Sequence, residues 1–202
     1  MTPIVAVVDH GAGNLVSIAR GLERAGAEVH LATGPDGLVG AHSVVLPGVG
    51  ATRTVMEGID AAALREPLRE LDVPLFGICV GMQVLFDTSE EDDAECLGLI
   101  PGVVRRLVDA PRLPHIGWND LDRRDDPMFD GVPDEPVYFV HSYAPVPDDD
   151  ATVVATSAHG STFVAAVRSG MVSGTQFHPE RSGRVGLAIL SNVVESARLV
   201  AT

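Results

Sequence analysis

The sequence contains no lysine: its 14 basic residues are all arginines, and they are outnumbered by 28 aspartates and glutamates. Chemistry that depends on a lysine amine is therefore excluded. The formal net charge of −14 argues against nucleic acid or an anionic membrane as the main partner, because both repel an acidic surface. Long apolar runs are also lacking, so no segment is expected to span a bilayer.

Cysteine is scarce too, with only Cys79 and Cys96 in the chain. Met1 leads directly into an apolar stretch without a basic leader region, which favours a cytoplasmic, reducing setting. An isolated cysteine in that setting is catalytic or inert rather than bridged. A chain of 202 residues, 46% hydrophobic and 21% charged, is typical of an ordinary globular protein, and we expect one domain over residues 1–202.

The first half alternates strand and helix patterns. Strands are expected at 4–8, 28–32, 43–46 and 73–79, and helices at 15–22, 54–71 and 81–86, with Pro67 as a candidate break. Strands alternating with helices of this length imply parallel strands joined by right-handed crossovers. The sequence therefore predicts an α/β, doubly wound, mostly parallel sheet with helices on both faces.

The second half favours strands, which makes the C-terminal half antiparallel and strand-rich. They are expected at 137–143, 152–157, 163–168 and 171–177, separated by turns such as Ser169-Gly170. A last helix from about Val185 follows, with Ser182 as a candidate N-cap. The acidic stretch 89–95 is interpreted as a solvated loop.

Cys79 stands where a strand pattern gives way to a helix pattern. Gly77 and Gly81 flank it at two residues on each side, and small residues at these positions relieve the crowding of a sharp strand-to-helix turn. Such a turn exposes the cysteine at a helix start, which favours the thiolate, and the N–H of Val80 can donate to an oxyanion. The alternative is a buried structural cysteine, and the paired glycines favour a nucleophile instead. Cys96 has none of these features.

His178 is the best candidate base for this thiol. It follows a strand pattern, and Pro179 favours an extended backbone, so that Glu180 projects to the same side as the imidazole. A carboxylate there can fix the tautomer of the ring. The His-x-Glu pattern is weak alone and gains strength from the cysteine turn. His115 and His141 favour structural roles, and no cluster has metal-ligand spacing, so neither a metal nor another cofactor is expected.

Together these segments resemble the class I, triad-type glutamine amidotransferases, and most closely the glutaminase subunits of imidazole glycerol phosphate synthase. The amidotransferase signature is found at 77–83 and 178–180. Segments typical of the subfamily are found at 9–14, 46–50, 114–119 and 139–143, so the resemblance extends over nearly the whole chain.

The resemblance implies roles for these residues. Cys79 attacks the carboxamide of glutamine and forms a thioester, His178 transfers protons, and Glu180 holds the imidazole. Val49 and Val80 supply the backbone N–H groups of the oxyanion hole, and the loop 47–50 rests in an inactive orientation until a partner carries its substrate. The positions that resemble glutamine-binding residues are Gly50, Gln83, Ser142 and Tyr143.

The implied partner is a separate (β/α)8-barrel cyclase, which receives ammonia through its barrel and forms a heterodimer with the glutaminase in histidine biosynthesis. The residues that resemble interface positions are Asn14, Trp118, Tyr138 and Arg181, although the two aromatics are equally compatible with a core. Two residues depart from the family pattern: His10 replaces the usual tyrosine, and Arg181 replaces the common lysine.

Three other functions are compatible with parts of this pattern. A glutaminase of another synthase would share the triad but not the Pro-His-Ile-Gly-Trp-Asn segment at 114–119. A non-catalytic amidotransferase-like interaction module would keep the fold without the intact triad. A cysteine hydrolase of peptides or esters would need a substrate groove that the sequence does not indicate.

Overall fold

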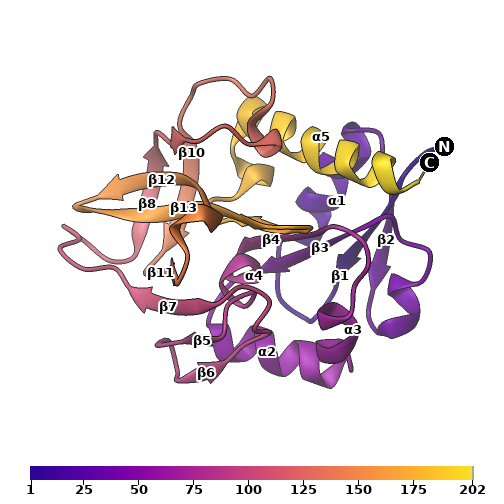
Figure 1. Ribbon diagram of the computed structural model, residues 1–202, viewed down its shortest axis with the longest axis horizontal. Coiled ribbons are helices and arrows are strands. Elements are labelled where there is room, and N and C mark those ends of the chain that lie inside the picture. Colours follow the sequence, from indigo (N-terminus) through magenta and orange to yellow (C-terminus); the bar gives the residue numbers. More distant parts are fainter. Residues whose placement is uncertain (202) are drawn as a thin grey trace.

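The structure is a computed structural model that describes residues 1–201. Its largest sheet has eight strands in the order β2-β1-β3-β4-β14-β13-β12-β9 (Figure 1). The first five strands of this order run parallel, and the last three pair antiparallel. The bounds are β1 Ile4–Val8, β2 Glu28–Ala32, β3 Ser43–Gly48, β4 Leu75–Cys79, β9 Asp122–Arg123, β12 Val153–His159, β13 Ser161–Ser169 and β14 Val172–Thr175.

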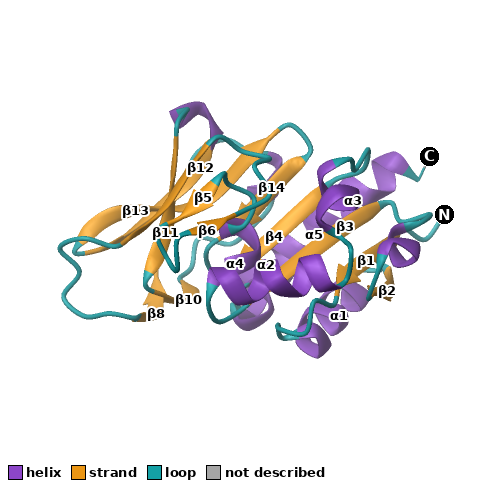
Figure 2. Cartoon of the chain, turned by 90° about the horizontal axis from the view of Figure 1, so that it is seen from below, coloured by secondary structure: helices purple, strands orange, loops and turns teal. Residues whose placement is uncertain are grey.

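Helices cover both faces of this sheet, as the sequence predicts. Two of them, α1 (Leu15–Arg24) and α5 (Gly183–Val200), lie on one face, while α2 (Thr52–Ala61) and α3 (Arg65–Arg69) lie on the other (Figure 1). The view from below in Figure 2 shows α2 in front of β3 and β4. The short helix α4 (Val80–Gln83) follows β4 directly, and 3-10 turns occur at Pro35–Leu38, Pro127–Phe129, Asp150–Thr152 and Pro179–Arg181.

The helix expected over 54–71 divides earlier than Pro67. The chain leaves α2 at Ala62, and Ala63 adopts a left-handed backbone with φ of 56° before α3 begins. Pro67 lies within the first turn of α3, where the missing N–H has no partner to lose. The expected break near Pro67 is therefore wrong, because the interruption comes between α2 and α3 and Pro67 lies inside α3.

The strand expected over 137–143 is two strands. The chain forms β10 (Val137–His141) and β11 (Tyr143–Pro147), and Ser142 between them lets each strand join a different sheet. The first pairs antiparallel with β8 (His115–Asn119), and the second with β7 (Gly102–Arg106). The sheet of β11 also contains β5 (Thr88–Ser89) and β6 (Ala94–Glu95).

The acidic stretch 89–95 is not simply a solvated loop, so that interpretation is wrong. It forms part of the β5–β6 hairpin, and Ser89 is buried. The carboxylate of Glu91 accepts hydrogen bonds from the backbone N–H and the hydroxyl of Thr52, at 2.9 and 3.0 Å. These bonds hold the hairpin against the start of α2, a long-range contact that charge patterning alone cannot reveal.

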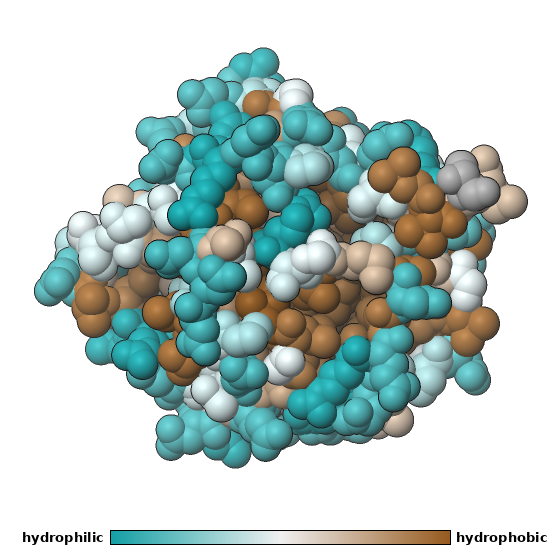
Figure 3. Space-filling model, viewed as in Figure 1, coloured by the Kyte–Doolittle hydropathy of each residue, from teal (hydrophilic) through white to brown (hydrophobic). Residues whose placement is uncertain are grey.

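Buried hydrophobic residues form one cluster that extends from the parallel strands to the antiparallel ones. Phe139 of β10 packs edge-on against Phe177, with 5.8 Å between ring centroids, which joins the β8–β10 ribbon to the main sheet. Hydrophilic residues cover most of the face in Figure 3, and hydrophobic residues gather in a hollow near its centre. Within residues 1–201, no helix combines the length and apolar character that a membrane span requires.

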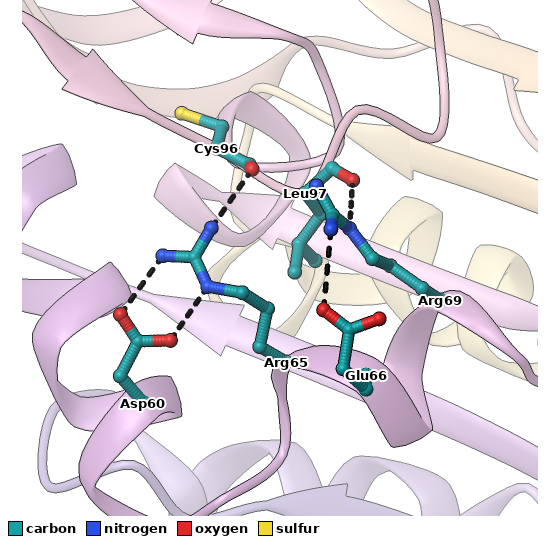
Figure 4. A network of polar contacts seen from close by, with 6 residues as sticks. All are labelled: Asp60, Arg65, Glu66, Arg69, Cys96 and Leu97. Atoms are coloured by element: carbon teal, nitrogen blue, oxygen red, sulfur yellow. Dashed lines mark hydrogen bonds and ion pairs between the residues drawn. The ribbon is translucent and has the colours of Figure 1, made fainter.

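Two arginines of α3, Arg65 and Arg69, form hydrogen bonds with the backbone of the segment that follows β6 (Figure 4). Arg65 forms a bidentate ion pair with Asp60 and donates to the carbonyl of Cys96 at 3.2 Å. Arg69 donates to the carbonyl of Leu97 at 2.7 Å. Burial raises the pKa of the Cys96 thiol to about 12, so this cysteine stays protonated at neutral pH.

Candidate active site

Cys79 occupies the sharp turn that the sequence predicts. It ends β4 with φ of 56° and ψ of −113°, a left-handed backbone that a non-glycine residue rarely adopts, and α4 starts at the next residue. A Cβ placed on Gly77 or Gly81 would lie 2.6 Å and 1.9 Å from backbone atoms of the neighbouring turn and strand. Glycine is therefore required on both sides of the cysteine for the turn to close.

The sulfur of Cys79 lies among polar groups from β10 and from the segment that follows β14. The thiol lies 3.9 Å from the carbonyl of Val140 in β10, and the side-chain amide of Gln176 donates to the sulfur at 3.6 Å. The cysteine is only 3% exposed.

His178 and Glu180 form a buried pair. Nδ1 of the imidazole lies 2.9 Å from Oε1 of the carboxylate, and the side chains are 4% and 0% exposed. Burial acts against a charged imidazole, but the nearby Cys79 sulfur and the Glu180 carboxylate outweigh it and raise the pKa of His178 to about 10. Nε2, on the opposite side of the ring, has no hydrogen-bond partner within residues 1–201. This nitrogen is the one available to exchange a proton.

Ser182 holds the segment that carries the histidine, but not by capping α5 as the sequence predicts. Its hydroxyl donates to the carbonyl of His178 at 2.7 Å and accepts from the backbone N–H of Tyr138 at 3.0 Å. The N–H of His178 in turn donates to the carbonyl of Tyr138 at 3.0 Å. These bonds fix the imidazole to β10, whereas no side-chain cap bond from Ser182 to α5 is found among the described residues.

The loop Pro47–Gly50 lies beside the cysteine. Gly48 is paired with Cys79 in the parallel β3–β4 ladder, so Val49 and Gly50 follow at the same edge of the sheet as Val80. Gly50 has a φ of 87°, and the side chain of Val49 is 38% exposed. The two backbone segments from which the resemblance draws oxyanion donors therefore meet at the end of β4.

These residues enclose one cavity of about 140 Å³. Cys79 and His178 line it. So does every residue with an expected oxyanion or glutamine-binding role: Val49, Gly50, Val80, Gln83, Ser142 and Tyr143. Glu180 lies behind the imidazole rather than in the wall. Residues more than a hundred positions apart are thus brought to a single site.

Gln83 supplies one wall of the cavity through a defined network. Its side-chain N–H₂ donates to the carbonyl of Tyr143 at 2.9 Å and to Oε1 of Gln176 at 3.0 Å. Because both donor hydrogens are engaged inside the protein, the side-chain carbonyl is the group of Gln83 that remains for a ligand.

Four residues of the site have no catalytic or binding role in the sequence interpretation, and one of them is Val140, whose carbonyl contacts the Cys79 sulfur. Gln176 touches the sulfur and Gln83, while Glu91 and His141 line the cavity. Gln176 lies near the end of the strand expected at 171–177 and two residues before His178, which is the only local signal for it. Glu91 stands in the stretch whose charge pattern predicts a solvated loop, and the pattern around His141 favours a structural role.

His141 forms part of an uncharged histidine pair. Its Nδ1 donates to the carbonyl of Tyr143 at 2.9 Å, and its Nε2 lies 3.1 Å from Nδ1 of His115. Burial lowers the pKa of His141 to about 3 and also lowers the pKa of His115. The pair therefore holds the Tyr143 carbonyl, the acceptor for Gln83, without adding charge near the cavity.

An exposed cluster continues from this ribbon. Trp118 of β8 and Tyr138 of β10 are paired across the two strands, with ring centroids 5.8 Å apart. The guanidinium of Arg181 lies 4.5 Å from the centroid of the Tyr138 ring. Trp118 is 57% exposed and does not belong to the core. Asn14 is the N-cap residue of α1, at the carboxyl edge of β1.

No set of three or more His, Cys, Asp and Glu side chains in the described chain is arranged to hold a metal ion. The site instead combines a sulfur, a buried imidazole–carboxylate pair and backbone amides. This set can carry out nucleophilic acyl transfer, with the sulfur as nucleophile and the imidazole as proton carrier.

Comparisons with known proteins agree with this chemistry. Residues 6–196 match the family described as glutamine amidotransferase class-I. The imidazole glycerol phosphate synthase subunit HisH of Synechococcus sp. (strain JA-3-3Ab) is 50% identical and covers 95% of this chain and 93% of that protein. The subunit of the same name from Xanthomonas axonopodis pv. citri (strain 306) is 50% identical, and the match covers 95% of this chain and 96% of that protein. The one from Natronomonas pharaonis is 49% identical, and the match covers 96% of this chain and 95% of that protein.

Solved structures share the fold at lower identity. The structure of PurLQS from Thermotoga maritima superimposes with a TM-score of 0.72 at 22% identity over 100% of both chains. A glutamine amidotransferase from the same organism, solved at 1.70 Å resolution, gives 0.65 at 19% identity, again over 100% of both chains. With a family match over nearly its whole length and relatives at half identity, the chain belongs to the class I glutamine amidotransferases.

Proposed function

We propose that this chain is the glutaminase subunit of an imidazole glycerol phosphate synthase, hydrolysing glutamine to glutamate and ammonia for a cyclase partner. The observation that carries the proposal is the convergence of Cys79, His178, Gln83 and the Pro47–Gly50 loop on one cavity. Relatives at about half identity over nearly the whole chain bear the name of that synthase subunit, which supports the assignment to one synthase among several.

The first half of the reaction forms a thioester. The sulfur of Cys79 attacks the side-chain carbonyl carbon of glutamine, and the carbonyl oxygen takes up the electron pair as an oxyanion. Backbone N–H groups of Val80 and the Val49 loop stabilise that oxyanion. His178, charged at neutral pH, then gives its Nε2 proton to the amide nitrogen, so that the C–N bond breaks and ammonia leaves.

The second half returns the enzyme to its starting state. The now neutral imidazole of His178 accepts a proton from water, and the hydroxide adds to the thioester carbon. The C–S bond breaks, glutamate leaves, and Cys79 regains its negative charge beside the imidazolium. Throughout, Glu180 keeps Nδ1 protonated and the ring oriented, because a carboxylate can only accept from it.

The α-amino group of glutamine is positively charged, so the site needs a group of opposite charge to bind it. Glu91 brings a carboxylate to the cavity wall, and it is fixed there by two hydrogen bonds from Thr52. We infer that Glu91 binds the ammonium group, while the free side-chain carbonyl of Gln83 orients the substrate.

A separate (β/α)8-barrel cyclase is the proposed partner, and the Trp118–Tyr138–Arg181 cluster its proposed docking surface, with Asn14 at the adjacent end of β1. Exposed aromatic and arginine side chains are enriched at the energetic centres of protein interfaces. Trp118 and Tyr138 of this cluster lie on the same β8–β10 ribbon as His141, which lines the cavity. This continuity gives docking a physical route to the geometry of the site.

The test is a glutaminase assay of the chain alone and with a purified cyclase and its nucleotide substrate. Hydrolysis by the lone chain should be weak and should rise strongly with the liganded cyclase. Cys79→Ala should abolish glutamate release, and Cys96→Ala, which removes the other buried cysteine, should retain it. Equal rates with and without the partner would refute the synthase assignment, and turnover by Cys79→Ala would refute the mechanism.

The same assay separates the alternative functions. A non-catalytic module would release no glutamate under either condition. A glutaminase of another synthase would hydrolyse glutamine but would not respond to this cyclase.

A further inference from the structure

His10 is a buried side chain outside the triad that contacts the oxyanion loop. It lies two residues after the end of β1 and is 8% exposed. Its backbone packs against α2, where a Cβ on Gly58 would lie 2.1 Å from the carbonyl oxygen of His10. Its Nε2 lies 2.7 Å from the carbonyl oxygen of Pro47, the first residue of the Pro47–Gly50 loop. The contact spans 37 positions of sequence.

The direction of this bond is fixed by chemistry. A backbone carbonyl can only accept, so Nε2 carries the proton and donates. Nδ1 is buried and has no partner among residues 1–201. Within the described residues, the His10 ring therefore makes one hydrogen bond, which it donates to the peptide group between Pro47 and Gly48.

The loop is held tightly at its beginning and loosely at its end. A Cβ on Gly13 would lie 3.2 Å from Cβ of Pro47, and a Cβ on Gly48 would lie 2.4 Å from the backbone nitrogen of Gly81. Gly50, by contrast, has a φ of 87° and open space around the position of a Cβ. The backbone at the Pro47–Gly48 end of the loop therefore has less room to move than the backbone at the Gly50 end.

We propose that His10 is a positioning residue for the oxyanion hole. By donating to the Pro47 carbonyl, it fixes the start of the Pro47–Gly50 loop, and this loop directs the Val49 N–H towards the side-chain carbonyl of the bound glutamine. This inference rests on the proposed glutaminase function. His10 touches neither substrate nor sulfur, and it acts only through the loop.

The effect of losing this bond should fall on the chemical step. Removal of a direct oxyanion donor costs on the order of 10²–10³ in kcat. Because His10 acts one peptide away from the donors, we expect a smaller loss of about tenfold in kcat. The KM for glutamine should stay within about twofold, since the loop base holds no part of the ground-state substrate.

Two variants of similar size isolate the donor. Gln at position 10 keeps an N–H at the place of Nε2, whereas Met has the same length and no donor. Glutamine hydrolysis is measured for wild type, His10→Gln and His10→Met, each in complex with the cyclase and its nucleotide substrate. Alkylation of Cys79 by iodoacetamide is followed in parallel, because it consumes the sulfur without forming an oxyanion.

The expected result is a loss of about tenfold in kcat for His10→Met, with recovery to within about threefold in His10→Gln and unchanged alkylation rates. Wild-type kcat in His10→Met, an equal loss in both variants, or a loss expressed in KM would each overturn the positioning role. A slowed alkylation would do so too, by placing the damage at the cysteine turn. A wild-type complex that releases no glutamate would instead overturn the proposed function, and this inference with it.

Discussion

Nδ1 of His178 and Oε1 of Glu180 lie 2.9 Å apart in a pair that is almost completely closed to solvent. The second carboxylate oxygen has no hydrogen-bond partner among residues 1–201, so the charge of Glu180 is directed to the imidazole. The short spacer Pro179 begins a 3-10 turn that brings the two side chains to one side. Removal of that charge should therefore be felt at Nε2, on the opposite side of the ring.

Glu180→Gln should lower kcat for glutamine on the order of 100-fold, because general acid–base catalysis contributes 10²–10⁴ and an uncharged partner no longer supports the imidazolium. The pKa of His178 should fall from its raised value, measurable by NMR titration of the imidazole. Glu195→Gln, which removes an exposed carboxylate paired with Arg198, is the matched control and should leave kcat unchanged. An unaltered kcat in Glu180→Gln would exclude the carboxylate from catalysis.

The raised pKa of His178 also has a consequence for stability. The folded chain holds a proton up to about pH 10 that the unfolded chain releases near 6.5, so its contribution is complete below pH 6.5 and declines as pH rises towards 10. Urea unfolding between pH 7 and 10 should show a shallower decline in Glu180→Gln than in wild type. The same slope in both proteins would contradict the coupling of this pair.

His141 predicts an acid-sensitive contribution of the opposite sign. Burial lowers its pKa to about 3, so between pH 6.5 and 3 the unfolded chain binds a proton that the folded chain does not. The free energy of unfolding should therefore decrease as the pH is lowered from 6.5 to 3. Asn at this position keeps a donor where Nδ1 lies and does not titrate, so His141→Asn should lose about 2 kcal/mol less than wild type between pH 7 and 5. Equal losses in urea unfolding would show that His141 is charged in the folded protein.

Arg181 should contribute to association rather than to chemistry. Its guanidinium covers the Tyr138 ring in a partly exposed position, where cation–π contacts contribute about 0.5–2 kcal/mol. Because this contact also holds the Tyr138 ring in place on the proposed docking surface, Arg181→Met should weaken binding to the cyclase about tenfold in a titration calorimetry experiment, while kcat at saturating cyclase stays near wild type. Arg198→Gln, near the C-terminal end of α5, is the control. An affinity that Arg181→Met leaves unchanged would remove the cluster from the interface.

The sequence predicts the parallel half and the chemical groups well, for local reasons. Gly77 and Gly81 indicate the tight turn at Cys79, and the turn has the left-handed backbone that this crowding requires. The alternation of apolar strands and amphipathic helices dictates β1 to β4 and their crossovers. His178 and Glu180 are two positions apart, so their pairing also depends only on local geometry.

Long-range contacts account for what sequence reasoning does not predict. Ser142 divides one apparent strand because each half pairs with a different partner. Ser182 bonds to His178 and Tyr138 instead of capping its helix. Glu91 carries the charge pattern of a solvated loop, yet Thr52, at a distance of 39 positions, holds it at the cavity. None of these partners is visible within a window of sequence.

The most direct test of the account is whether the sulfur of Cys79 becomes acylated by glutamine. The chain, in complex with the liganded cyclase, is mixed with glutamine, quenched in acid within the first turnover and digested for mass spectrometry. We predict a γ-glutamyl group on the peptide that contains Cys79, absent from the Cys96 peptide and from His178→Ala. Steady release of glutamate with Cys79 unmodified at every quench time, in a reaction whose rate does not depend on this sulfur, would contradict it.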